Sequence, residues 1–151
     1  MRLLLLLYGL FFGFLGNAQD TTTTYNPKLA KELGADDYGM KNYIFVLLKS
    51  GSTEMTDQDS LNIIYRGHFD NMEVMARNGK LALSGPFGKN EKGYRGLFIL
   101  DVASKTEALE LLQKDPAIAA GIFDVELTPW YGSAALPVFI ETHNKIAKLK
   151  P

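Results

Sequence analysis

The sequence predicts a single α+β domain in which strands and helices follow one another in the order βαββαβ. Two segments, 43–48 and 97–100, are apolar at every position, which is typical of strands covered on both faces. Two other segments carry apolar residues at helical spacing and begin at capping signals. The length of 151 residues, 46% of them hydrophobic, fits one ordinary domain better than two.

Ahead of this domain, the chain begins with the features of a secretory signal. Arg2 supplies a positive charge, residues 3–15 carry no charge, and residues 16–18 place small side chains ahead of Gln19. The apolar stretch is shorter than the roughly 20 residues that a membrane-spanning helix needs. We therefore predict that a signal peptide is removed before Gln19 and that the mature protein is exported, to the periplasm or the medium.

The first strand and the first helix are the clearest elements. Tyr43 to Leu48 predicts the strand, and Thr56 followed by Asp59 resembles a capping box that opens the helix. Asn78 and Gly79 end the helix in the manner of a left-handed cap. The apolar stripe of this helix consists of Leu61, Ile64, Tyr65, His68, Met72 and Met75.

Two further strands follow, a short one over 81–84 that Gly85 and Pro86 close, and an apolar one over 95–102. Because the short strand has the character of an edge, we place the first and third strands at the centre of the sheet.

The second helix and the last strand complete the domain. Ser104 and Glu107 form a second capping box, and the helix has to stop at Asp115 because Pro116 disfavours helical geometry in the residue before it. Apolar and polar residues alternate over 123–128, which is typical of an edge strand with one wet face. The order is that of a ferredoxin-like fold with a four-stranded antiparallel sheet.

In such a fold two helices cover one face of the sheet, and the other face is also apolar here. A second copy, packed sheet against sheet, is the simplest way to cover it, so we predict a homodimer.

The domain resembles the YCII-related family, a branch of the dimeric α/β barrel proteins. The features that match lie between about Lys41 and Trp130, and it is their order and spacing that is specific. They are the apolar first strand, His68 in the first helix, Gly79, Ser84-Gly85-Pro86, Gly96, Asp115-Pro116, Gly121 and Thr128-Pro129-Trp130. The resemblance implies a subunit that pairs through its sheet into a dimeric α/β barrel. It also implies a histidine and an aspartate, best matched by His68 and Asp115, as the proposed catalytic pair of a family whose reaction is mostly unestablished.

Two departures from the family stand out: the exported N-terminus and the long tail. We divide the chain into a signal peptide (1–18), a polar leader (19–40), the YCII-related domain (41–130) and a C-terminal tail (131–151).

Each member of the candidate pair also has an ordinary structural interpretation. His68 lies in an apolar stripe, so it can be a core histidine that donates one N–H to a nearby acceptor. Asp115 precedes a proline at a helix end, where a carboxylate commonly satisfies backbone N–H groups. A half-buried histidine beside a carboxylate is equally how a general acid–base catalyst is built. The sequence leaves both interpretations open.

Other candidates are weaker. Arg66 and Arg95 are single arginines that can hold a substrate carboxylate but are more often solvated. Trp130 and Tyr131 can stack on a ligand but more often seal a core or an interface. We expect His143 to be an exposed tail residue. The absence of cysteine and the presence of only two histidines disfavour a metal centre, so we predict no metal and no cofactor.

The sequence therefore predicts a small exported enzyme of unknown substrate that uses His68 and Asp115 for proton transfer, in an isomerisation, elimination or hydrolysis of a small organic molecule. The alternative is a non-catalytic dimeric module that binds a small ligand, and a third interpretation, ranked last, makes His68 a haem ligand. A net charge of −1 argues against a nucleic-acid partner, and we predict no membrane association once the signal is removed.

Overall fold

The computed structural model describes residues 24–149. The predicted signal peptide and the first residues of the leader lie outside this range. The elements are α1 (Pro27–Leu33), β1 (Met40–Ser50), α2 (Gln58–Arg77), β2 (Leu81–Pro86), β3 (Tyr94–Leu100), α3 (Lys105–Leu112), α4 (Pro116–Ala119), β4 (Phe123–Ser133) and α5 (Val138–Ile146). Within the described range, no helix combines the length and the apolar character that a bilayer crossing requires.

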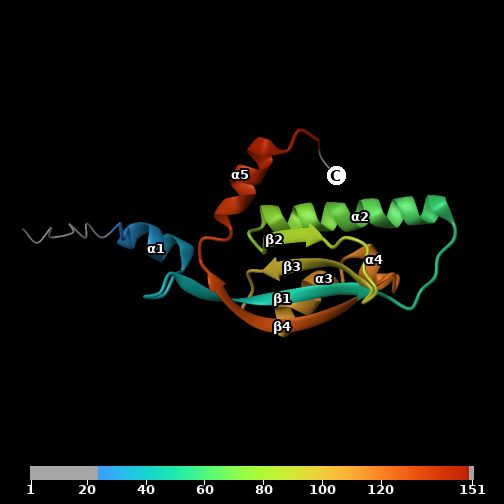
Figure 1. Cartoon of the computed structure of the whole chain (residues 1–151), viewed down its shortest axis with the longest axis horizontal. Helices are drawn as coiled ribbons and strands as arrows, with labels where there is room; N and C mark the ends of the chain where they lie inside the picture. The colour runs from blue at the N-terminus through green and yellow to red at the C-terminus, as the bar shows by residue number, and fades with distance from the viewer. Residues whose placement is uncertain (1–23, 150–151) are drawn as a thin grey trace, which may run out of the picture.

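The four strands form one antiparallel sheet in the order β2-β3-β1-β4 (Figure 1). The doubly apolar strands β1 and β3 are central, and β2 and β4 are the edges, as the sequence predicts. The fold is ferredoxin-like α+β. β1 pairs with β4 along its whole length, from Met40 opposite Ser133 to Ser50 opposite Phe123.

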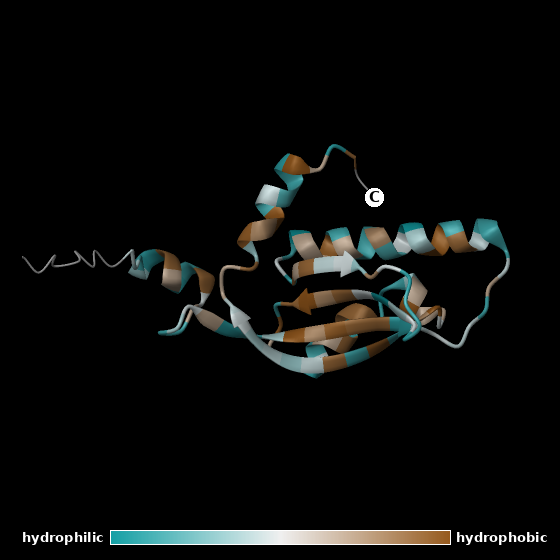
Figure 2. Ribbon diagram, in the orientation of Figure 1, coloured by the Kyte–Doolittle hydropathy of each residue, from teal (hydrophilic) through white to brown (hydrophobic). Residues whose placement is uncertain are grey.

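One face of the sheet carries the main core, and α2 and α3 cover it. Val46 of β1 and Phe98 of β3 pack with Met75 of α2 and with Ala108 and Leu112 of α3, and all five are almost fully buried. Figure 2 shows that the central strands β1 and β3 carry mostly the brown colour of hydrophobic residues. This core fixes α2 over the sheet and thereby the position of His68.

The opposite face has a smaller core. Tyr43, Ala82 and Ile99 are buried there, and Leu136 from the segment that leads into α5 packs on them. Trp130, whose register partner is Tyr43, remains 39% exposed. Apart from α5 and the segment that leads into it, no helix covers this face in the described part of the chain. Much of the face therefore stays accessible in the single subunit.

The helix ends show where local signals were correct and where they were not. The Ser104 hydroxyl accepts a hydrogen bond from the Glu107 backbone N–H, as predicted. At α2 the predicted cap is wrong by one residue: Asp57 is the N-cap, and its carboxylate accepts from the Ser60 N–H. Asp and Thr are both good N-caps, so composition alone does not choose between adjacent positions.

A short helix, α4, was not predicted. It begins at Pro116, directly after its N-cap Asp115. Four residues are too few for an amphipathic pattern, so the sequence carried only the Asp-Pro signal. This one turn determines where the Asp115 carboxylate lies.

Candidate active site

The structure brings His68 and Asp115 together. Nδ1 of His68 lies 2.6 Å from Oδ2 of Asp115, across 47 residues of sequence. The Asp115 side chain is completely buried, and 8% of the His68 side chain is exposed. A contact this short, away from water, is a strong charge-assisted hydrogen bond whenever the carboxylate is ionised.

Asp115 also caps α4, so it has the structural role that its position before a proline suggested. Its Oδ1 accepts from the backbone N–H groups of Ala117 at 2.9 Å and Ile118 at 3.4 Å. The other oxygen, Oδ2, is thereby left for the imidazole. The cap fixes the orientation of the carboxylate, and the carboxylate in turn holds the imidazole.

The two helices that carry the pair approach closely because of a glycine. Gly67, next to His68 on α2, lies against Pro116, and a Cβ at residue 67 would be 2.7 Å from the Pro116 Cγ. A larger side chain would push α4 away from α2. The pair therefore depends on the sequence Gly67-His68 meeting Asp115-Pro116.

Aromatic rings surround the imidazole. The centroids of Phe69, Phe98 and Phe123 lie 5.6, 5.9 and 5.3 Å from that of His68, with Phe98 stacked and the other two edge-on. Nε2 of His68 makes no hydrogen bond within residues 24–149. It is also not one of the fully buried polar atoms that lack a partner, so it keeps contact with solvent. His68 is thus a core residue with one free ring nitrogen.

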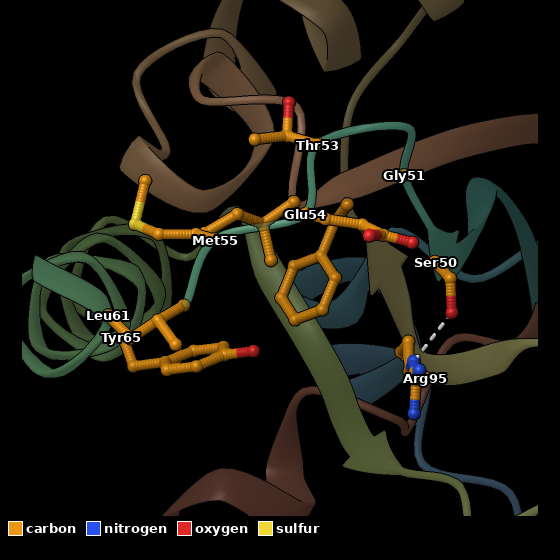
Figure 3. A pocket seen from close by; sticks show the side chains of 10 residues that line it. Ser50, Gly51, Thr53, Glu54, Met55, Leu61, Tyr65 and Arg95 are labelled. Atoms are coloured by element: carbon orange, nitrogen blue, oxygen red, sulfur yellow. Dashed lines mark hydrogen bonds between the residues drawn. The ribbon is translucent and has the colours of Figure 1, made fainter. Parts of the chain in front are cut away.

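A hollow of about 560 Å³ opens beside this cluster, between the end of β1, the loop before α2 and the start of β4 (Figure 3). Tyr65 and Phe123 line it, and their ring centroids are 6.0 Å apart. His68 does not line it. Instead, His68 lies behind Phe123, one ring away from the hollow.

Of the weaker candidate residues, only some lie at the hollow. Arg95 lines the hollow, whereas Arg66 does not. Trp130 packs against Tyr43, with their ring centroids 5.9 Å apart, and the Tyr131 hydroxyl donates a hydrogen bond to Asp36. These two aromatic residues are therefore part of the sheet and its edge rather than of the hollow.

His143 lies in α5 and is exposed, as expected. In the part of the chain that the structure describes, no three His, Asp or Glu side chains are grouped so as to hold a metal ion. His68 does not line the hollow, and three aromatic rings pack around its imidazole, so nothing in residues 24–149 favours the interpretation of His68 as a haem ligand.

Sequence reasoning missed most of the hollow. Ser50, Thr53, Glu54 and Met55 contribute to it from the end of β1 and the polar loop that follows. Tyr65 was assigned to the apolar stripe of α2, but it is 37% exposed and lines the hollow. No spacing rule marks a loop that folds across a strand end, so only the fold could show this site.

Comparisons with known proteins add the family. No curated protein matches the chain. A solved structure of 5-chloro-2-hydroxyhydroquinone dehydrochlorinase from Burkholderia phenoliruptrix AC1100, in complex with 2,5-dihydroxybenzoquinone, has a TM-score of 0.41 and 20% sequence identity. That likeness covers 58% of this chain and 92% of the other, and at this level it says nothing about the substrate. The family model for the YCII-related domain matches residues 44–131, more than half of the chain. The chain belongs to the YCII-related domain family.

Proposed function

We propose that the protein is a small-molecule enzyme in which His68 transfers a proton and Asp115 orients the imidazole and stabilises its protonated form. The observation that carries the proposal is the 2.6 Å contact between His68 Nδ1 and Asp115 Oδ2, in a site where the other ring nitrogen is free. A buried carboxylate–imidazole pair with one open nitrogen is the arrangement of a general acid–base catalyst.

The roles follow from the hydrogen bonds. An ionised carboxylate can only accept, so Nδ1 of His68 carries the proton, and in the neutral ring the lone pair is on Nε2. When Nε2 takes a proton from a substrate, the Asp115 charge stabilises the imidazolium that forms. A positioned base of this kind accelerates proton transfer by about 10²–10⁴-fold.

A substrate in the hollow would reach Nε2 past Phe123. This ring contacts both His68 and Tyr65 and stands at the first position of β4, next to a loop. We propose that its side chain turns aside when a substrate binds. Isomerisation, elimination and hydrolysis can all begin with proton removal by a base, and the geometry of the pair serves all three.

The test does not need a known substrate. Wild-type protein and the His68→Gln variant are incubated with a small-molecule extract of the source cells in D₂O, and untargeted mass spectrometry follows deuterium uptake and conversion. A base that removes a proton bound to carbon or splits a bond leaves a mass change. We expect at least one compound to change with the wild type and not with the variant.

The second histidine of the chain provides the matched control. His143 is exposed on α5, so the His143→Gln variant should behave as the wild type. Equal behaviour of all three proteins, with no compound changed, would contradict the enzyme proposal. The alternative, a binding module, is favoured by the fact that His68 does not line the hollow. It predicts that compounds co-purify with both wild type and His68→Gln and that none is converted.

We also propose that two copies pair through the open face of the sheet. Leu83 is 40% exposed there, opposite the buried Ile99. Stable pairing would bury roughly 1,200–2,000 Å² in total. Light scattering should report a dimer, which Leu83→Lys should weaken and Leu109→Lys should not, since Leu109 on α3 is equally exposed (41%) but lies away from this face. A monomeric wild type would contradict the proposal.

Export is a further proposal, supported by the sequence of residues 1–18 alone. Mass spectrometry of the protein from its source should find Gln19 at the N-terminus. Intact chain that begins at Met1 would contradict it.

A further inference from the structure

The hollow beside Phe123 is lined by an exposed cation, Arg95, which one side-chain hydrogen bond orients and which has unused hydrogen-bond donors. Nε of Arg95 donates to Oγ of Ser50 at 2.8 Å, and that hydroxyl can in turn donate to the carbonyl oxygen of Gly93 at 3.4 Å. The terminal nitrogens of the Arg95 guanidinium make no hydrogen bond or ion pair with any residue of the described range 24–149. Figure 3 shows the bond from Arg95 to Ser50 on one side of the hollow and Tyr65 on the other.

A guanidinium fixed at Nε presents its remaining N–H groups as a planar fork. This geometry matches the two oxygens of a carboxylate better than it matches a neutral group. Because Ser50 already holds the side chain, a ligand would lose less binding free energy in ordering it.

One side of the wall is apolar and aromatic, whereas the side formed by the end of β1 and the loop after it is polar. Tyr65 and Phe123 form one side, with Met55 and Leu61 beside them. The volume of about 560 Å³ falls in the range of pockets for small organic ligands. A ligand with its acid group on Arg95 can therefore lay its apolar body against the two rings, on the side of the hollow nearest to His68.

Glu54 is the other charged group of this wall. It forms no ion pair with Arg95 in the described chain, although both line the hollow. Its carboxylate would repel a simple anion and would accept a hydrogen bond from a hydroxyl or amino group. The two charges together favour an acid that also carries a donor.

We propose that this hollow binds a small organic carboxylate with an apolar body, that Arg95 is its anchor, and that Glu54 selects compounds with a hydroxyl or amino group. The proposal names the substrate class of the proposed enzyme and rests on that function only for the step that follows binding.

Direct binding tests the proposal with benzoate, 4-hydroxybenzoate and the neutral analogue benzamide as probes. NMR titration follows the backbone signals of the mature wild-type protein and of the Arg95→Gln, Arg66→Gln and Glu54→Gln variants. We expect benzoate to shift signals of the hollow and benzamide to bind at least about tenfold more weakly. Arg95→Gln should weaken benzoate binding about tenfold or more, because a charge-assisted pair is lost, and the matched control Arg66→Gln should leave it unchanged. Glu54→Gln should strengthen the binding of benzoate relative to that of 4-hydroxybenzoate.

Benzoate that does not shift these signals, or that binds Arg95→Gln and wild type equally, overturns the proposal. An unchanged preference between the two acids in Glu54→Gln overturns the role of Glu54. His68→Gln should bind benzoate as the wild type does, which separates this inference from the proposed function. Loss of deuterium exchange with retained benzoate binding supports both, whereas exchange without benzoate binding overturns only the site.

Discussion

Replacing Asp115 separates its two structural roles. Asp115→Ala removes the cap of α4, which costs about 0.5–2 kcal/mol, and leaves Nδ1 of the buried His68 without a partner, which costs about 1–3 kcal/mol. The sum is about 1.5–5 kcal/mol of the free energy of unfolding. Asp115→Asn keeps an acceptor oxygen for the cap, since Asn caps as well as Asp. Its amide Nδ2 then faces His68 and can only donate, so the charge-assisted bond from the Nδ1 N–H is replaced by a neutral one that Nδ1 accepts, with the ring proton on Nε2, at a cost of about 1 kcal/mol.

Urea unfolding at one fixed protein concentration measures both variants, because a change in midpoint at constant slope reports stability. Asp70→Ala is the control: Asp70 is exposed on the same helix as His68, and its removal should stay within about 0.5 kcal/mol of wild type. If Asp115→Ala costs no more than Asp70→Ala, the contacts of Asp115 contribute nothing to folding.

Three further predictions concern the framework. Gly51→Ala should destabilise the fold strongly, because the new Cβ would collide with the backbone carbonyl oxygen of Gly121. Gly85→Ala, which has open space around the new Cβ, should lower the melting temperature much less, and thermal melts of the two variants measure the difference. The hydrogen bond from Lys80 lowers the pKa of Glu107 from 4.5. This pair therefore stabilises the fold above pH 4.5, and its contribution is lost as the pH falls through the lowered pKa. Unfolding curves at several pH values should show that Glu107→Gln removes this part of the acid dependence of stability. Burial raises the pKa of Tyr43 from 10.0 to about 12, so the neutral hydroxyl stabilises the fold below pH 10, and this contribution is lost toward pH 12. Ultraviolet titration should show one tyrosine fewer ionising near pH 12 in Tyr43→Phe than in the wild type.

The sheet could be predicted because its signals are local. Runs such as 43–48 are apolar on both faces, and strand centrality follows directly from that pattern. The cap at Ser104 depends on neighbouring residues and was also correct, whereas the helix predicted to stop at Asp115 already ends at Leu112, and Asp115 caps the next helix instead. The cap of α2 was misplaced because Thr56 and Asp57 are both competent caps and only the path of the loop chooses between them.

The site was predictable only in part. The family resemblance identified His68 and Asp115, and the structure shows that they meet across 47 residues. It also shows that one aspartate can serve as both cap and partner, a combination that sequence spacing does not reveal. The hollow was not foreseen, because Glu54 and Arg95 line one wall only after the loop that follows β1 has folded against Gly121 and Ile122, the residues just before β4.

The position of the proton on the neutral His68 ring decides whether this residue can act as the proposed base. Two-bond ¹H–¹⁵N NMR spectra of the ¹⁵N-labelled wild type distinguish the tautomers of a neutral imidazole, and the exposed His143 provides an internal reference. We expect neutral His68 to carry its proton on Nδ1, donated to Asp115, and Nε2 to be free. A neutral ring protonated on Nε2 would contradict this role, because the atom proposed to accept the substrate proton would already be occupied.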